Sequence, residues 1–96
     1  MENKIYMIDL FDLYGSLLTE KQQNTFIDSY YHDLSLSELA LNYGVSRNAI
    51  HKQIKEAEHK LQFYEEKLLL YKKKQKMCAI IEKIEDKQIK KELEEL

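Results

Sequence analysis

The 96-residue chain contains no proline and no tryptophan, and it has only two glycines and one cysteine. Because proline and glycine interrupt helices most strongly, their scarcity beside many Leu, Ile, Lys and Glu residues predicts a nearly all-helical protein. The single cysteine, Cys78, excludes an intrachain disulfide and is consistent with a reducing compartment. The sequence also lacks a long uncharged apolar run and a signal peptide, so we expect a cytoplasmic protein without a membrane span.

Residue patterns typical of catalysis are also missing. The three histidines, His32, His51 and His59, share no metal-like spacing. Asp28 and His32 stand at i and i+4, but two ligands without a third usually belong to a plain surface. Cys78 lies on an apolar stripe, where we expect a small core residue rather than a nucleophile. We therefore predict no enzyme activity, no catalytic residue, no metal site and no cofactor.

The net charge of −2 hides an uneven distribution. Residues 1–45 carry two lysines against seven acids, whereas residues 46–76 carry nine basic residues against four acids. Residues 77–96 return to an excess of acids, six against four lysines. A basic block between acidic ends suggests that residues 46–76 meet an anionic partner. The alternative is a lysine-rich helix face that only contacts water.

The N-terminal half divides into short helices. Residues 4–18 form the first, with a broad apolar stripe of Ile5, Ile8, Phe11, Leu13, Tyr14, Leu17 and Leu18. Thr19 and Gln22 fit a capping box that opens a second helix, whose buried side is Phe26, Ile27, Tyr30 and Tyr31. Ser35 and Glu38 form another capping box, followed by Leu36 and Leu39 facing a small core.

The segment SLSELALNYGVSRNAIHKQI carries the most informative spacing. Two helices that cross steeply need a small residue at their contact, which Ala40 supplies. They need a tight turn, and Gly44 can adopt the left-handed conformation at no penalty. Val45, Ile50 and Ile54 would pin the second helix on the first. The spacing predicts a helix-turn-helix, with a structural corner between two helices as the alternative.

The second helix of this motif has polar positions that packing does not use. Ser46 can cap the helix, and the free amides at its start suit a phosphate. Arg, Asn, His and Lys side chains can bond base edges in a major groove, and lysines can pair with phosphates. We therefore predict a nucleic-acid-binding site made of Ser46, Arg47, Asn48, His51, Lys52 and Lys55. Each of them could also be an ordinary exposed side chain.

Residues 18–61 resemble the promoter-binding C-terminal domain of bacterial sigma factors, in which a Leu-Thr-x-x-Gln opening leads to a helix-turn-helix. The pieces LFDLYGSLLTEKQ, YYHDLSLSELA, YGVSRNAIHKQIK and LQFYEEKLLLY resemble the YlxM family of small sigma-factor-like helix-turn-helix proteins still more closely. These pieces cover residues 10–71. The resemblance implies a regulator associated with the signal recognition particle pathway.

Three positions depart from the family pattern. Asn48 stands where a longer Gln is expected, which shortens the reach of a base contact. Glu56 and Glu58 stand where basic residues often follow the recognition helix. We expect both acids to repel phosphate, by an amount that depends on the salt concentration.

The C-terminal part is expected to remain helical, either without interruption or with a break near residues 72–76. Leu61, Tyr64, Leu68 and Tyr71 have a and d spacing, continued by Gln75 and Cys78, and a second stripe of Met77, Ile81, Ile84, Ile89, Leu93 and Leu96 follows with a shifted phase. Such a stripe must be buried, either against the first helix or in a homodimer. Because the core is small, we expect a homodimer with a seam of Leu61, Leu68, Ile81 and Ile84.

The prediction is thus an all-α protein with a helix-turn-helix domain at residues 1–60 and a long C-terminal helical extension at residues 61–96, for packing or dimerisation. Its expected function is regulation by binding duplex DNA. The alternative is a protein-interaction module without an operator, which would modulate the GTPases or the RNA of the signal recognition particle.

Overall fold

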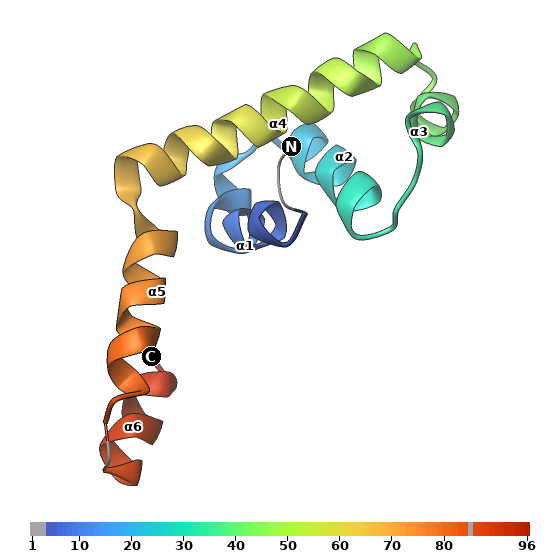
Figure 1. Cartoon of the computed structure of the whole chain (residues 1–96). Helices are drawn as coiled ribbons and strands as arrows, with labels where there is room; N and C mark the ends of the chain where they lie inside the picture. The colour runs from blue at the N-terminus through green and yellow to red at the C-terminus, as the bar shows by residue number, and fades with distance from the viewer. Residues whose placement is uncertain (1–3, 85) are drawn as a thin grey trace.

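A computed structural model describes residues 4–84 and 86–96 (Figure 1). Its elements are α1 (Lys4–Tyr14), a 3-10 turn (Gly15–Leu17), α2 (Glu20–Tyr30), α3 (Leu36–Tyr43), α4 (Arg47–Leu68), α5 (Leu70–Ile81) and α6 (Lys87–Glu94). The described residues form helices and loops without a strand, which confirms the all-α prediction. Among those helices, none is both long and apolar enough to cross a membrane.

The longest helix, α4, organises the molecule. Helices α1, α2 and α3 pack against it and form a body, while the chain turns away from the body at the end of α4 (Figure 1). We call the residues beyond this turn, 70–84 and 86–96, the arm. The projecting arm explains why the molecule measures 55 × 25 × 25 Å although it is short.

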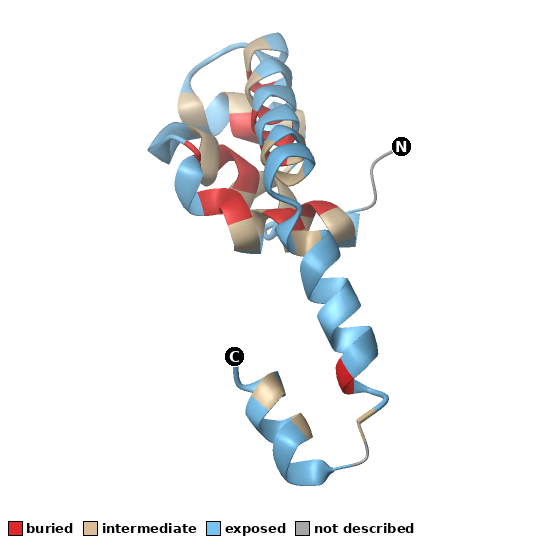
Figure 2. Cartoon of the chain, turned by 90° about the vertical axis from the view of Figure 1, so that its left-hand side faces the viewer, coloured by how far each residue is buried: buried red, intermediate tan, exposed pale blue. Residues whose placement is uncertain are grey.

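Two apolar clusters hold the body together. The larger one joins α1, α2 and the middle of α4 through Met7, Leu10, Tyr14, Leu18, Phe26, Ala57 and Leu61. The smaller one joins α3 to the start of α4 through Leu39, Ile50 and Ile54. Full burial of a large apolar side chain stabilises a fold by about 1.5–3 kcal/mol. Figure 2 shows that buried residues concentrate in the body, whereas the arm is mostly exposed.

The predicted apolar faces of the first two helices were partly wrong. Ile5 is 70% exposed and Leu17 is 51% exposed, whereas Met7 and Leu10, which the predicted stripe omitted, are fully buried. The buried residues follow one narrow helical face, because side chains three and four positions apart share a side. Phe26 of α2 is buried as predicted, but Tyr31, the capping residue at the end of α2, is 43% exposed.

The predicted helix starts are confirmed. Thr19 Oγ1 accepts from the amide of Gln22, whose side chain accepts from the Thr19 amide, so the capping box is complete. Ser35 and Glu38 make the same pair of bonds at the start of α3. These bonds satisfy amides that have no partner within the helix, and each cap stabilises its helix by about 1 kcal/mol.

Four tyrosine hydroxyls donate to carboxylates on other helices and tie the body together. The pairs are Tyr14–Glu65 at 2.7 Å, Tyr43–Asp28 at 2.6 Å, Tyr31–Asp12 at 3.2 Å, and Tyr30–Glu58. Burial, followed by the nearby carboxylate, raises the pKa of Tyr14 and of Tyr31. For Tyr43, the hydrogen bond to Asp28 is the largest cause of its raised pKa, followed by burial. The folded protein therefore favours the neutral phenols.

The helical extension is broken, but not near residues 72–76, which lie inside α5. The break falls at Leu69, which has left-handed angles of φ 56° and ψ 30°. We call residues 68–70 the elbow. A left-handed residue other than glycine is uncommon and costs about 1–2 kcal/mol, so other contacts must stabilise the elbow.

Those contacts come from the body. The amide of Leu70 donates to the hydroxyl of Tyr14 at 2.9 Å, and the amide of Tyr71 donates to Glu65 Oε1 at 3.0 Å. The Lys72 amide adds a longer bond to Glu65 Oε2 at 3.3 Å. Tyr14 and Glu65 thus replace the missing side-chain cap at the start of α5. The direction of the arm is set by α1 and α4, not by a glycine or proline.

The predicted C-terminal stripe does not form one continuous seam. Leu61 is buried in the body and Ile81 is buried where α5 meets α6, but Leu68 is 46% exposed. Cys78 is exposed, so the expectation of a small core residue was wrong. The bend at the elbow separates the two halves of the stripe, because it ends the common helical register at Leu69.

Candidate nucleic-acid interface

The helix-turn-helix is formed by α3, a short turn and the first half of α4. Leu39, Ile50 and Ile54 are its buried centre, and Ala40 packs at the side of this cluster. The small side chain of Ala40 fits the prediction of a close contact between the two helices. Tyr30 packs against both this cluster and the larger one, so the helix-turn-helix is joined to the rest of the body.

Gly44 makes the turn as predicted, with left-handed angles of φ 66° and ψ 34°. The Val45 amide donates to the carbonyl of Ala40 at 3.1 Å and closes the end of α3. Val45 itself is 37% exposed and lies outside the cluster, so its predicted role as a pin was wrong. Ile50 and Ile54 are the residues of α4 buried against α3, as predicted, whereas Val45 stays at the surface.

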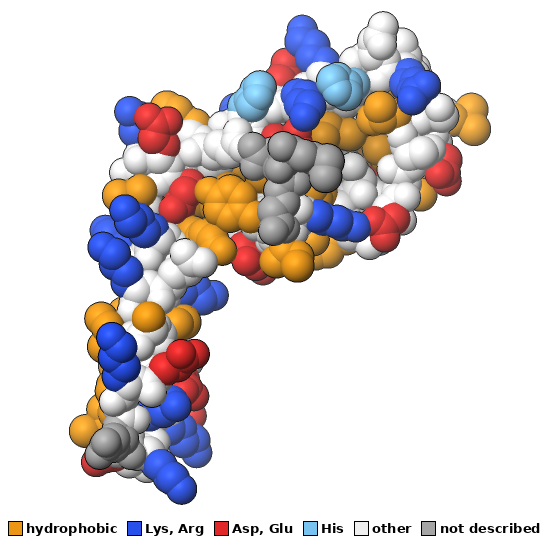
Figure 3. Space-filling view, in the orientation of Figure 1, with side chains coloured by type: hydrophobic (Ala, Val, Ile, Leu, Met, Phe, Trp, Pro, Cys, Tyr) orange, Lys and Arg blue, Asp and Glu red, His pale blue; other side chains and the backbone are white. Residues whose placement is uncertain are grey.

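All six predicted site residues belong to the first part of α4 or to its cap, and all are exposed. Asn48, Lys52 and Lys55 follow one another at spacings of four and three, so they share one side of the helix. Arg47 and His51 are likewise four residues apart and occupy an adjacent side. Basic and histidine side chains gather along this edge of the molecule over α4 (Figure 3).

Two of the six have additional partners. Ser46 Oγ accepts from the amide of Ala49 at 3.1 Å, so its cap role is confirmed. Lys55 Nζ lies 3.3 Å from Glu58 Oε1. Because the carboxylate of Glu58 partly neutralises its charge, Lys55 attracts a phosphate less strongly than an unpaired lysine would. Arg47, Asn48, His51 and Lys52 have no side-chain partner among the described residues.

The acids that were expected to repel phosphate differ from each other. Glu58 is buried, with its carboxylate bonded to the Tyr30 hydroxyl and paired with Lys55, so it faces the body. Glu58 also lines a groove beside α4 together with Lys55. Glu56 is exposed. The expected repulsion of phosphate by the two acids stays a prediction.

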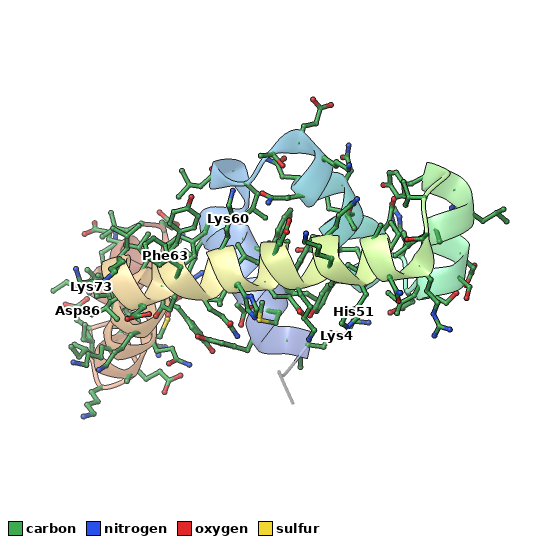
Figure 4. All side chains as sticks on the ribbon, turned by 90° about the horizontal axis from the view of Figure 1, so that it is seen from above. Lys4, His51, Lys60, Phe63, Lys73 and Asp86 are labelled. Atoms are coloured by element: carbon green, nitrogen blue, oxygen red, sulfur yellow. The ribbon has the colours of Figure 1, made fainter. Side chains whose placement is uncertain are left out.

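A groove of about 360 Å³ lies beside the first half of α4. Its lining combines Lys4 of α1, three residues of α4 (His51, Lys55 and Glu58), the apolar side chains of Leu36 and Ile54, and Ser29 and Tyr30 of α2. Figure 4 shows Lys4 and His51 on the same side of α4. No sequence pattern indicated Lys4, because only the packing of α1 brings it near residue 51. Lys4 also pairs with Asp33.

The i, i+4 pair of Asp28 and His32 serves the fold. His32 Nδ1 lies 3.2 Å from Asp28 Oδ1, and the other oxygen of Asp28 accepts from the Tyr43 hydroxyl. Within residues 4–84 and 86–96, no three potential ligands gather in a way that could hold a metal ion. Asp28 therefore links α2 to the end of α3.

The chain matches a known family over residues 1–96, the UPF0122 family, described as "Putative helix-turn-helix protein, YlxM / p13 like". It is 45% identical over 82 residues to a UPF0122 protein of Caldanaerobacter subterraneus subsp. tengcongensis, covering 85% of this chain and 70% of that relative. It is 44% identical over 86 residues to the UPF0122 protein YlxM of Bacillus subtilis, covering 90% and 78% of the two chains.

A third relative is matched over a shorter region. A UPF0122 protein of Malacoplasma penetrans is 54% identical over 59 residues, which is 62% of this chain and 55% of that relative. The chain thus spans just over half the length of this relative.

Proposed function

Because the chain belongs to the family of YlxM- and p13-like helix-turn-helix proteins, we propose that it binds duplex DNA through the first half of α4. The observation that carries this proposal is the exposed face of Arg47, Asn48 and Lys52 on α4, whose opposite side packs on α3 through Ile50 and Ile54. A helix presented in this way can enter a major groove, with its first residues at the base edges.

Each residue has a role in this proposal. In this proposal, the guanidinium of Arg47 makes a bidentate hydrogen bond to a base edge in the major groove. The shorter side chain of Asn48 contacts a base edge beside it. Lys52 pairs with a phosphate. Lys55 does so more weakly, because its ammonium group is already paired with the carboxylate of Glu58. Ser46 caps the start of α4. His51 lines the groove next to Lys4.

The test is fluorescence anisotropy with labelled duplexes of varied and scrambled sequence, at low and moderate salt. Arg47→Ala should lose about 1–3 kcal/mol on the preferred duplex and should reduce the preference among sequences. Lys52→Ala should weaken binding to all duplexes alike and reduce the slope of log affinity against log salt by about one unit.

Lys87→Ala is the matched control, because it removes one exposed lysine from α6, far from the turn of the motif. Its affinity for each duplex should equal that of the wild type. If Arg47→Ala and Lys52→Ala bind duplexes as the wild type does at low salt, the helix does not read DNA.

A second candidate function is a protein-interaction module acting on signal recognition particle GTPases or RNA, which the sequence resemblance implies. The observation that favours it is the side chain of Phe63, 53% exposed further along α4, with Lys67 Nζ 5.7 Å from the ring centroid. Exposed aromatic residues beside cations often anchor protein partners. In this case Phe63→Ala would reduce binding to those components, while DNA would bind weakly and without sequence preference.

Both candidate functions assign the same roles to the two parts of the chain. We propose that residues 1–60 contain the binding unit and that residues 61–96 serve packing or association. Leu61 closes the larger cluster of the body, and the segment beyond the elbow extends into solvent.

A further inference from the structure

The groove beside the first half of α4 continues the exposed face of the helix-turn-helix. Arg47, His51 and Lys55 follow one another at spacings of four, so they lie along one side of α4. Lys4 reaches the same groove from the start of α1 (Figure 4). We call the groove lined by Lys4, His51 and Lys55 the α1–α4 groove. It brings nitrogen groups from two helices to one place.

The position of this groove along α4 suits the backbone of a bound duplex. Because a helix rises about 1.5 Å per residue, His51 and Lys55 lie about 6 Å and about 12 Å along the axis from Arg47. The major groove of B-DNA is about 12 Å wide and is bordered by phosphate backbones. With Arg47 at a base edge, residues 51–55 therefore come close to a bordering backbone. This step rests on the proposed function.

The charges at the α1–α4 groove balance when His51 is neutral. Lys55 Nζ lies 3.3 Å from a carboxylate oxygen of Glu58, which also lines the groove. Lys4 pairs with Asp33, which follows α2. Two cations thus face two carboxylates. A proton on His51 adds the net positive charge that attracts a phosphate.

The α2 side of the groove contributes hydroxyls. The Tyr30 hydroxyl donates to the second carboxylate oxygen of Glu58, and Ser29 has a hydroxyl that can donate to a phosphate. Histidine is the side chain that ordinarily changes its charge between about pH 5 and pH 8. Since His51 is the histidine of this groove, its affinity for a phosphate should vary within that range.

A phosphate can replace the partner of Lys4. The side chains of Lys4 and Asp33 are 52% and 72% exposed, and exposed ion pairs are weak. Asp33 has a left-handed φ of 55°, which Asp and Asn adopt more readily than most residues. Asp33→Asn therefore removes the competing charge without straining the turn.

We infer that the α1–α4 groove binds one phosphate of the duplex backbone through Lys4 and protonated His51, and that Asp33 competes with this phosphate for Lys4. Helix α1 then belongs to the interface, which extends beyond the motif of α3 and α4. The contact makes duplex binding tighter at low pH, because His51 carries its charge there.

The first test is fluorescence anisotropy of the full chain with labelled duplexes at about pH 6 and about pH 8. The wild type should bind about two- to fivefold more tightly at the lower pH, as expected for one exposed charge contact. His51→Gln should remove this difference. The control is His59→Gln, which changes an exposed histidine of α4 outside the groove and should keep the difference. A full pH effect in His51→Gln would overturn the proposal.

The second test changes Lys4 and its competitor at the lower pH. Lys4→Ala should weaken binding to all duplexes alike and reduce the slope of log affinity against log salt by about one unit. Asp33→Asn should strengthen binding about two- to fivefold, a gain that unfolding cannot produce. The control is Glu20→Gln, which removes an exposed acid at the opposite end of α2 and should leave the affinity unchanged. If Lys4→Ala or Asp33→Asn binds as the wild type does, Lys4 does not meet the backbone.

These measurements separate the inference from the proposed function. A wild type that loses affinity in Arg47→Ala but not in Lys4→Ala refutes the inference alone, whereas a wild type that binds no duplex refutes both. Inorganic phosphate distinguishes a free anion from the backbone. In calorimetry without duplex, the wild type should show no saturable phosphate binding, because a single anion lacks the neighbouring contacts of Arg47 and Lys52. Saturable binding that Lys4→Ala removes would overturn the assignment of the groove to the duplex.

Discussion

Removing the hydroxyl of Tyr14 tests whether the body holds the arm in place. Tyr14 is fully buried, and its hydroxyl donates to Glu65 at 2.7 Å while it accepts from the Leu70 amide at 2.9 Å. Tyr14→Phe keeps the ring in the larger cluster and deletes both bonds. The change therefore isolates the contribution of the hydroxyl to the elbow.

The expected cost follows from these two bonds. A hydrogen bond to a charged group contributes about 1.5–3 kcal/mol, and the Tyr14–Glu65 bond is of this kind. The Leu70 amide costs less to release, because Leu70 is 42% exposed and water can replace the hydroxyl. We expect a loss of about 2 kcal/mol, which lowers the melting temperature of a domain of this size by roughly 8–16 °C.

Two measurements check this prediction. Thermal unfolding followed by circular dichroism gives the change in stability. The distance distribution between spin labels on exposed Cys78 and on a cysteine that replaces exposed Glu56 reports the angle of the arm. This distribution should broaden in Tyr14→Phe, because Glu65 alone then caps α5.

Tyr64→Phe is the matched control. The ring of Tyr64 lies 6.1 Å from that of Tyr14, but its hydroxyl has no hydrogen-bond partner among the described residues. Its melting temperature and label distances should remain close to those of the wild type. If Tyr14→Phe behaves like Tyr64→Phe, the elbow does not depend on the body, and the cause assigned to it here is wrong.

Three further predictions concern the body. Gly44→Val should cost at least about 1–2 kcal/mol in thermal unfolding, through backbone strain alone, since a Cβ there meets nothing within 4 Å; an unchanged melting temperature would contradict the left-handed turn. Ala40→Leu should cost about 1–3 kcal/mol by overpacking the contact between α3 and α4, and an equally stable variant would show that this contact is loose. Stability in urea should be fully present below about pH 10 and fall above it, because folding raises the pKa of Tyr14 and Tyr43. Tyr43→Phe should make this alkaline decline shallower, and an identical decline would exclude Tyr43 as a cause.

Local signals predicted the helix-turn-helix well. The capping boxes at Thr19 and Ser35, the turn at Gly44 and the cap at Ser46 all depend on residues within four positions of one another. Such contacts can be predicted from the sequence because the partner residues are fixed by helical geometry. The six candidate site residues were found exposed together for the same reason: they share one short stretch of one helix.

Contacts between distant residues account for what the sequence could not predict. A glutamate is expected at the surface, but Glu58 is buried. Its carboxylate accepts a hydrogen bond from the hydroxyl of Tyr30, which is 28 positions away in the sequence. Lys4 reaches the groove beside His51 because α1 packs across α4. The elbow interrupts a stretch that lacks both glycine and proline, because partners up to 56 positions apart stabilise a conformation that Leu69 alone would avoid.

The elbow couples the arm to the core of the body. Tyr14 belongs to the larger cluster that holds α4, and the hydroxyl of the same side chain accepts from the Leu70 amide at the start of α5. Loss of this hydroxyl should therefore affect both the stability of the body and the direction of α5, whereas a change that only unpacks the cluster should affect the first more than the second.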